Sequence, residues 1–190
     1  MTAMPAAGLM TADEFLLLEY EGVRTQLIDG VIVVNEPGLL HQMVLRAVFL
    51  AISDWCRAAP GRGREWLPLD VRIDDRNVFG PDMLWYAEGR GPRRDGGRPS
   101  PTPDLAVEMR SPSTWRYDIG AKLRLYEDHG LPELWLVDTA ADVVLVFRRS
   151  APAALAFDVA LEFARGDALT SPAMPGFALA LDELFADTEQ

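Results

Sequence analysis

TPDLAVEMRSPSTWRYDIGAKLRLYEDHGLPELWLVD, residues 102–138, holds the charged groups and the changes of periodicity that decide the fold. Residues 104–110 alternate between two kinds of side chain, which predicts a strand. Residues 117–129 have helical spacing and are followed by Gly130, which is typical of the end of a helix. Residues 133–137 form a second, strongly apolar strand. This order predicts a crossover helix between two strands of one sheet.

The segments on either side extend this pattern. Thr11 and Glu14 have the spacing of a capping box, which predicts a short helix to about residue 20. Asp29-Gly30 is typical of a tight hairpin turn between two short strands. We predict further strands over 24–28, 31–34, 67–73, 83–86, 143–147 and 157–163, the last at a sheet edge, and helices over 39–58 and 181–185. The expected fold class is therefore α/β (mixed α+β), with a mixed β-sheet flanked by helices.

Length and composition indicate one domain. The chain has 190 residues, of which 49% are hydrophobic, and this is enough to bury a sizeable core. We predict a single domain over 1–190, with its core over about 11–185 and a mobile Gly/Pro-rich loop over 87–103. No run approaches 18 consecutive apolar residues, and the first ten residues carry no basic segment, so neither a membrane span nor a signal peptide is expected. The single Cys56, expected to be buried and inert, suits a reducing cytoplasm.

The charge balance restricts the class of partner. A net charge of −11 argues against a broad basic face, which proteins that grip duplex DNA usually have because phosphate neutralisation supplies much of the affinity. Any positive surface must be local, and the candidate is the loop with Arg90, Arg93, Arg94 and Arg98. This loop can be a solvated segment or a DNA contact. An acidic nuclease remains workable if carboxylates bind a metal ion that supplies positive charge.

The predicted strand over 104–110 has a carboxylate, Glu108, near its middle, where burying a charge is energetically costly. Alternate residues share a face, so Asp104, Glu108 and Arg110 point one way, while the apolar residues between them point into the core. A buried carboxylate needs a partner. A structural ion pair from Glu108 to Arg110 or Lys122 is one interpretation of this pattern, and a catalytic site is the other.

Two further charged residues favour the catalytic interpretation. Asp82 follows Pro81 at the entrance of the strand over 83–86, which can neighbour Glu108. Lys122 lies four residues after Asp118 on the predicted helix, so these two can also form an ordinary exposed bridge. Carboxylates and a lysine at such places are what a Mg²⁺-dependent phosphodiester-cleaving site needs.

Other residues with reactive or stacking side chains have simpler interpretations. Four tryptophans are expected to be core or rim aromatics rather than base-stacking platforms: Trp66, Trp85, Trp115 and Trp135. The run Ser111-Pro112-Ser113-Thr114 is expected to be a turn and helix cap. We predict no zinc site, because the chain has only one cysteine and two histidines to serve as ligands.

A set of short motifs runs through the chain in a fixed order. The motifs are Gln26-Leu27-Ile28-Asp29-Gly30, His41, Pro81-Asp82, Pro103-Asp104-Leu105-Ala106-Val107-Glu108, Ser111-Pro112-Ser113-Thr114, Asp118, Lys122, Tyr126, Gly130, Glu133-Leu134-Trp135-Leu136-Val137-Asp138, Leu169-Thr170-Ser171 and Pro175-Gly176-Phe177. In this order the chain resembles the restriction-endonuclease-like family called Uma-two, over roughly residues 11–185. Each motif alone is weak, but the ordered set is specific. The family is grouped with the PD-(D/E)XK nucleases, so the resemblance implies a restriction-endonuclease-like core and a metal-dependent DNA endonuclease that hydrolyses phosphodiester bonds.

The resemblance also implies roles for individual residues. Asp82 and Glu108 would bind Mg²⁺ or Mn²⁺, with the backbone carbonyl of Met109 as a further ligand. The superfamily's lysine usually lies two residues after the second acid, where this chain has Arg110, and the resemblance places the lysine at Lys122 instead. Arg110 cannot act as a base, because a guanidinium keeps its proton in proteins, but it can stabilise charge on the phosphate. We expect Lys122 to position or polarise the attacking water.

Three positions leave alternatives open. Gln26 stands where the family commonly has glutamate, and its neutral carbonyl weakens a hard-cation site, so the number of metals and the activity are both in question. His41 matches the family's position, with a hydrogen-bonding or a catalytic role. Asp104 can support the site from behind Glu108 or cap the start of its strand.

The expected partner is DNA, in a cytoplasmic homodimer without a membrane partner. Two competing interpretations remain. One is a catalytically decayed nuclease fold that binds nucleic acid or protein, which Gln26 and the net charge favour. The other is a dimeric interaction protein that assembles through an exposed edge and the apolar hairpin near Trp135 and Phe147.

Overall fold

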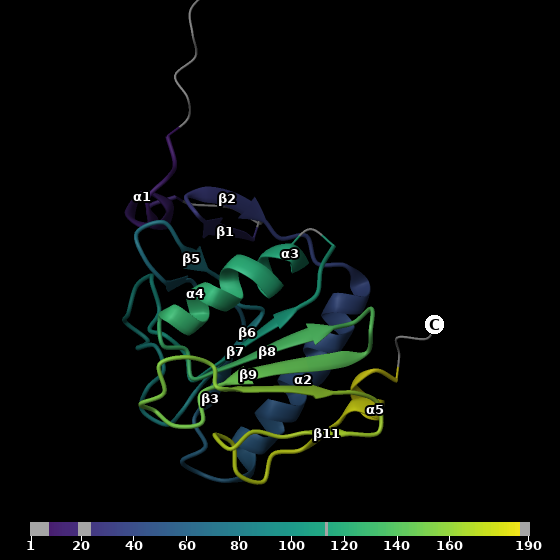
Figure 1. The fold of residues 1–190 in the computed structure, drawn as a ribbon. Helices are drawn as coiled ribbons and strands as arrows, with labels where there is room; N and C mark the ends of the chain where they lie inside the picture. Colours follow the sequence, from purple (N-terminus) through teal and green to yellow (C-terminus); the bar gives the residue numbers. More distant parts are fainter. Residues whose placement is uncertain (1–7, 19–23, 113, 187–190) are drawn as a thin grey trace, which may run out of the picture.

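The central element is a six-stranded mixed sheet. The computed structural model describes residues 8–18, 24–112 and 114–186. The sheet has the order β10-β9-β8-β7-β6-β3, and its strands are β3 (Arg64–Trp66), β6 (Met83–Tyr86), β7 (Leu105–Met109), β8 (Glu133–Asp138), β9 (Val143–Arg148) and β10 (Val159–Phe163). Only β7 and β8 pair in parallel, and the helical segment joining them crosses over the sheet (Figure 1). The predicted crossover unit is therefore confirmed.

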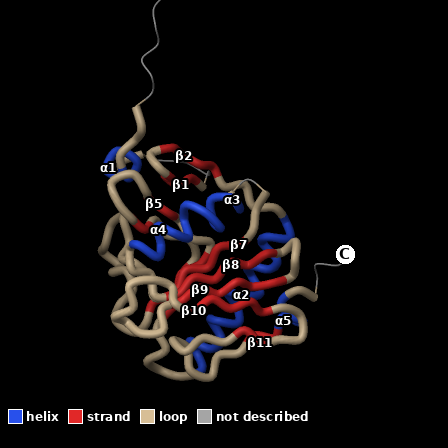
Figure 2. Tube along the Cα trace, in the orientation of Figure 1, coloured by secondary structure: helices blue, strands red, loops and turns tan. Residues whose placement is uncertain are grey.

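Helices and a smaller sheet cover the two faces. The helix α2 (Leu39–Ala58) packs on one face with α5 (Leu181–Leu184), against Leu105, Val107 and Met109 of β7. The other face carries α4 (Leu123–Asp128) and a four-stranded sheet of order β2-β1-β5-β4, and Ala106 lies there. Figure 2 shows the strands between these helices. The predicted fold class, a mixed sheet flanked by helices, is confirmed.

The smaller elements complete the chain. The four-stranded sheet consists of β1 (Thr25–Ile28), β2 (Val31–Val34), β4 (Val71–Arg72) and β5 (Val78–Phe79), and a third sheet pairs β11 (Ala168–Leu169) with β12 (Leu179–Ala180). The remaining helices are α1 (Ala12–Leu16), α3 (Trp115–Tyr117) and a π-helical turn, η1 (Asp118–Lys122). The β1–β2 turn has positive φ at Asp29 (50°) and Gly30 (75°), the geometry of a primed hairpin turn. The capping box of Thr11 and Glu14 opens α1 as predicted.

Three predicted elements differ from the structure. The strand over 67–73 is wrong: β3 ends at Trp66, β4 begins at Val71, and the two belong to different sheets. Pro68 between them has no backbone N–H to donate to a ladder. The helix α1 ends at Leu16, and residues 19–23 lie outside the described part of the chain. The crossover helix begins earlier than predicted and contains the π turn.

Two surfaces bear on partners. By length and composition alone, α2 could cross a membrane, with a mean hydropathy of 1.2 over 18 residues, but Val44, Val48 and Ile52 are buried against the sheet as in a core helix. In the β8–β9 hairpin, Trp135 is fully buried and β10 pairs with β9, while Phe147 is half-buried. The predicted edge position of β10 is confirmed, and assembly through this edge and hairpin stays a prediction.

Candidate functional site

A buried group of charges joins β7 to the π turn. The Nζ of Lys122 lies 2.6 Å from Oε1 of Glu108 and 2.9 Å from Oδ1 of Asp118. The exposed fractions of these three side chains are 0%, 3% and 2%. The Asp118–Lys122 pair is thus not the exposed bridge that its spacing allowed. Because all three groups are buried, each charge is stabilised mainly by the other two, and removing one would leave the rest uncompensated.

Local structure directs each of these groups to the same point. Glu108 faces the side of β7 that carries Ala106, as the alternation predicts. The π turn brings Asp118 and Lys122 to this face, and isolated π turns occur frequently at functional sites. One turn later, the hydroxyl of Tyr126 donates to Oε1 of Glu108 at 2.7 Å. Glu108 Oε1 therefore accepts from one hydroxyl and pairs with one ammonium.

Asp82 lies beside this group on the neighbouring strand. Met83 pairs with Val107 in the antiparallel β6–β7 ladder, so the residue before Met83 lies opposite Glu108. Oδ2 of Asp82 accepts the amide of Met109 at 2.8 Å. Oδ1 receives a hydrogen bond from Nη1 of Arg24 and lies 3.3 Å from Nε2 of His41, in the first turns of α2. Four segments distant in sequence thus meet at one carboxylate.

The environment separates the pKa values of these acids. Burial raises the pKa of Glu108 to about 7, with the charge of Lys122 opposing this shift and those of Asp118 and Asp82 adding to it. Burial likewise raises the pKa of Asp118. Burial alone would also raise the pKa of Asp82, but His41, the Met109 amide and Arg24 together hold it below its ordinary value. Burial alone would lower the pKa of Lys122, and the charges of Asp118 and Glu108 raise it instead.

These donors suit a divalent ion that keeps part of its hydration. Asp82 and Glu108 offer carboxylate oxygens on adjacent strands, and Mg²⁺ is usually held by one or two carboxylates together with water and substrate phosphate. Within residues 8–18, 24–112 and 114–186, no group of three or more His, Cys, Asp or Glu side chains is placed to hold a metal ion. Asp82 and Glu108 thus offer two carboxylates for an ion whose other ligands would have to come from elsewhere.

Two predicted accessory residues lie outside this group. Arg110 pairs with Asp138 at 2.8 Å and lies over the ring of Trp115, so the structural pair of Glu108 with Arg110 does not form. Asp104 lies at the opposite end of β7, where it pairs with Arg90 at 3.0 Å and accepts the amide of Ala87 at 2.8 Å. Asp104 therefore anchors the start of the 87–103 loop.

The other accessory residues lie close to Asp82. Gln26 is buried on β1, and its Oε1 accepts the amide of Gly80 at 3.2 Å. Arg24, two residues earlier, also donates to the carbonyl of Gly80 at 3.2 Å. Sequence reasoning missed Arg24, although residues two apart on a strand share a face, and Gln26 had already been singled out.

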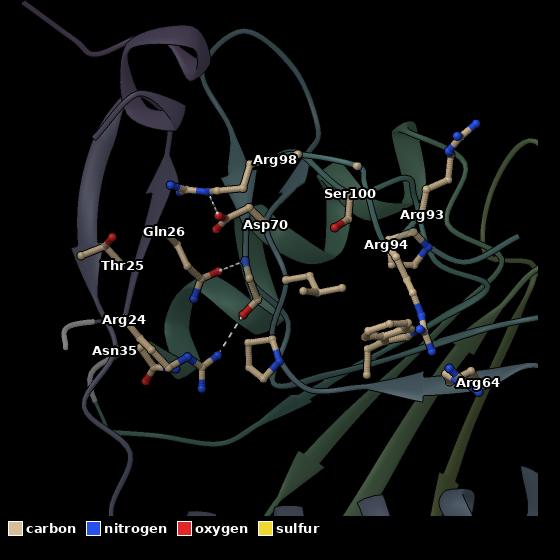
Figure 3. Close-up of a pocket in the computed structure, with 17 residues that line it drawn as sticks. Arg24, Thr25, Gln26, Asn35, Arg64, Asp70, Arg93, Arg94, Arg98 and Ser100 are labelled. Atoms are coloured by element: carbon tan, nitrogen blue, oxygen red, sulfur yellow. Dashed lines mark hydrogen bonds and ion pairs between the residues drawn. The ribbon is translucent and has the colours of Figure 1, made fainter. Parts of the chain in front are cut away.

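A cavity of about 800 Å³ begins at these residues. Its wall includes Arg24, Gln26 and Gly80 at one end, and Figure 3 shows Arg64 and Arg94 gathered at the other. Five arginines line it: Arg24, Arg64, Arg93, Arg94 and Arg98. Three of the four loop arginines predicted to contact nucleic acid thus line one cavity, whereas Arg90 is paired with Asp104. The cavity therefore gathers five arginines, and one of them, Arg24, donates to Asp82.

Comparisons with known proteins agree with this architecture. Residues 12–182 match the model of the Uma2 family, described as "Putative restriction endonuclease". The fold is similar to the crystal structure of a protein described as a "putative nuclease belonging to DUF820" from Anabaena variabilis ATCC 29413, with a TM-score of 0.77 and 22% identity over 93% of this chain and 98% of that chain. None of the curated proteins compared with the chain matches it.

Proposed function

The chain belongs to the Uma2 family, and from this premise we propose that it is a Mg²⁺- or Mn²⁺-dependent DNA endonuclease that hydrolyses phosphodiester bonds. One observation carries the proposal: Asp82 and Glu108 stand on adjacent strands, Lys122 lies 2.6 Å from Glu108, and Arg24, which donates to Asp82, lines a cavity together with four further arginines. Structural ion pairs also bury charge, but they do not require a neighbouring cavity whose walls would attract phosphate.

Asp82 and Glu108 would hold the ion, with the backbone carbonyl of Met109 as a further oxygen. A bound divalent ion would supply a more acidic water and neutralise the phosphate oxygens. Asp82 is suited to this task because its lowered pKa keeps it ionised. Glu108, with a pKa of about 7, becomes a better ligand as the pH rises above neutrality.

Lys122 would act as a donor and not as a base. Its raised pKa keeps the proton on Nζ, so the ammonium can orient the attacking water or stabilise charge on the five-coordinate phosphate. Tyr126 positions Glu108 through its hydroxyl. Water attacks phosphorus, the bond to the 3′ oxygen breaks, and the products are a 5′-phosphate and a 3′-hydroxyl. Cutting both strands of a duplex needs two such centres, so the proposal includes a homodimer in the cytoplasm.

The decisive test is cleavage of supercoiled plasmid at low salt with Mn²⁺ or Mg²⁺. We expect nicking by the wild type and its loss in Asp82→Asn, Glu108→Gln and Lys122→Met. Matched controls lie on the same helical segment: Arg124→Met and Asp128→Asn remove exposed charges and should leave nicking unchanged. Nicking that persists in all three site variants would refute the assignment.

A second function is favoured by Gln26. Its neutral oxygen already accepts the Gly80 amide, which leaves fewer anionic ligands than a glutamate would give. The alternative is a decayed nuclease fold that binds nucleic acid without cutting it. Absence of nicking, together with no heat of Mn²⁺ binding in a calorimetric titration, would support that alternative. Mn²⁺ binding without nicking would point to Gln26, and Gln26→Glu should then restore cleavage.

A further inference from the structure

The cavity that begins at Arg24 shares four wall residues with a second one. The larger has a volume of about 800 Å³ and the smaller about 340 Å³, and both are lined by Arg64, Trp66, Pro92 and Arg93. The surface formed by the two cavities and their shared wall, from Arg24 to the loop after β6, is here called the arginine groove. A groove longer than one site suits a ligand that runs along it.

The arginine groove carries positive charge that the protein does not neutralise. Arg93 pairs with Asp95, and Arg98 pairs with Asp70. Arg64 and Arg94 are exposed, and neither has a carboxylate partner among the residues that the structure describes. Figure 3 shows these two side chains at the same end of the cavity, while Arg93 points away. Two guanidinium groups without a carboxylate partner, in the wall of one cavity of a chain of charge −11, favour a phosphate-containing ligand.

Two polar atoms of the wall are buried without a hydrogen-bond partner among the described residues. They are Oδ1 of Asn35, whose residue is 6% exposed, and Nε1 of Trp66. Leaving such groups unpaired is unfavourable, so a ligand whose polar atoms reach them on entering the cavity gains a hydrogen bond. One atom is an acceptor and the other a donor, and the Trp66 indole adds an aromatic face where the two cavities meet. A nucleobase offers the complementary features.

Size decides between paired and unpaired strands. A cavity of about 800 Å³ falls in the range of ~300–1,000 Å³ that holds small molecules, so it can take a nucleotide but not a duplex. A base in a duplex cannot reach an aromatic wall unless it leaves the stack. Proteins that bind single strands combine a positive groove with aromatic side chains on which bases stack.

Arg24 connects the groove to the acidic residues. Its guanidinium lines the cavity and donates to both Asp82 and the carbonyl of Gly80. A strand that follows the arginines from Arg64 would therefore carry its phosphate toward Asp82. This connection makes the groove the route of the substrate to the proposed catalytic site.

We propose that the arginine groove binds an unpaired nucleic-acid strand, with a base stacked on Trp66 and phosphates held by Arg64 and Arg94. The inference rests on the proposed function and specifies its substrate class. It extends the expected loop contact in two ways. Arg64 joins the phosphate contacts, and Trp66, expected to be a rim aromatic, becomes a stacking platform.

The test is fluorescence anisotropy with a labelled 12-nucleotide DNA strand, the same sequence as a duplex, and the same sequence as RNA, all in EDTA. We expect the single strand to bind about tenfold tighter than the duplex. Trp66→Leu should weaken single-strand binding by about tenfold, whereas Trp66→Phe should retain most of it because the ring remains. Tighter binding of the RNA strand would support the groove and identify RNA as the strand it prefers.

Variants of the arginines test the groove without substituting Trp66, whose replacement can also affect folding. Arg64→Gln with Arg94→Gln removes two phosphate contacts, so the salt dependence of log K should become shallower by about 1.4 for a single strand. Arg124→Gln removes an exposed charge outside the groove and should change nothing. Equal or tighter binding of the duplex, or a salt slope matching that of Arg124→Gln, would overturn the inference.

The two proposals can fail separately. Binding in EDTA requires no cleavage, so single-strand binding without Mn²⁺-dependent nicking would retain the groove and reject the nuclease. Nicking of plasmid without single-strand preference would retain the nuclease and reject the groove.

Discussion

Lys122→Met should destabilise the fold, and the loss should grow with pH. The substitution preserves side-chain length but leaves Glu108 and Asp118 buried without the ammonium that lies 2.6 and 2.9 Å away. Removing one partner of a buried ion pair costs ~3–5 kcal/mol because the remaining charge is uncompensated. We expect a loss of this size in the free energy of unfolding at pH 8.

The pH dependence follows from the raised pKa of Glu108, about 7 in the folded protein against 4.5 in a model compound. A raised folded pKa contributes stability that is present below the unfolded pKa and is lost as pH rises through the folded pKa. Without the Lys122 charge this pKa rises further, so the variant loses stability over a wider pH range than the wild type. At pH 8 this adds at most about 1.4 kcal/mol to the difference, because a folded pKa well above 8 leaves Glu108 protonated in the variant.

Urea unfolding followed by tryptophan fluorescence at pH 5.5 and pH 8 measures both quantities. Arg124→Met is the matched control, since Arg124 is an exposed arginine two residues further along the same helical segment. Its loss should stay within ~0.5 kcal/mol. A Lys122→Met loss below 1 kcal/mol at pH 8, or one equal at both pH values, would contradict the buried-pair argument.

Three further predictions test separate features. Glu108→Gln removes a group whose pKa rises from 4.5 to about 7, so between those pH values the wild type should lose about 3 kcal/mol of unfolding free energy relative to the variant; parallel pH profiles from urea titrations would contradict this. Gly30→Ala should cost ~1–2 kcal/mol, because φ is +75° and the new Cβ would lie 2.7 Å from Cβ of Leu9, whereas Gly97→Ala, with open space around it, should cost far less in the same thermal melts. Burial raises the pKa of Cys56 to about 11, so at pH 8 its reaction with a disulfide reagent should be slow and should accelerate at least tenfold in unfolding urea; equal rates would show an accessible thiol.

The parts of the site that could be predicted from sequence lie on regular elements. The alternation around Glu108 fixed which side chains face the core, and the Asp29-Gly30 turn fixed the β1–β2 register. Position in the sequence singled out Asp82 and Lys122, and the resemblance to a family supplied the roles expected of them; the structure brings both next to Glu108. The catalytic roles of these residues remain predictions.

The parts that escaped prediction depend on contacts between distant segments. Spacing made Asp118 and Lys122 a surface pair, but the π turn and the second sheet bury both. Arg24 reaches Asp82 across 58 residues, a contact that no local pattern contains. The apolar alternation over 67–73 is real, but Pro68 separates it into strands of two sheets. Local sequence patterns specify which face of a strand or helix a residue lies on and where turns occur. Whether that face is buried depends on which distant segments pack against it.

The π turn restricts where the chain can change length. Asp118, Lys122 and Tyr126 all reach the Glu108 region from one continuous helical segment. Deleting one residue within that segment would rotate everything after it by about 100° around the helix axis and turn Tyr126 away from Glu108. The 87–103 loop contains turns but no helix or strand of this kind, so insertions there leave the acids in place. Among homologous chains, gaps should collect in the loop and be absent from residues 114–130, and a homologue with a gap in that second window should have lost the site.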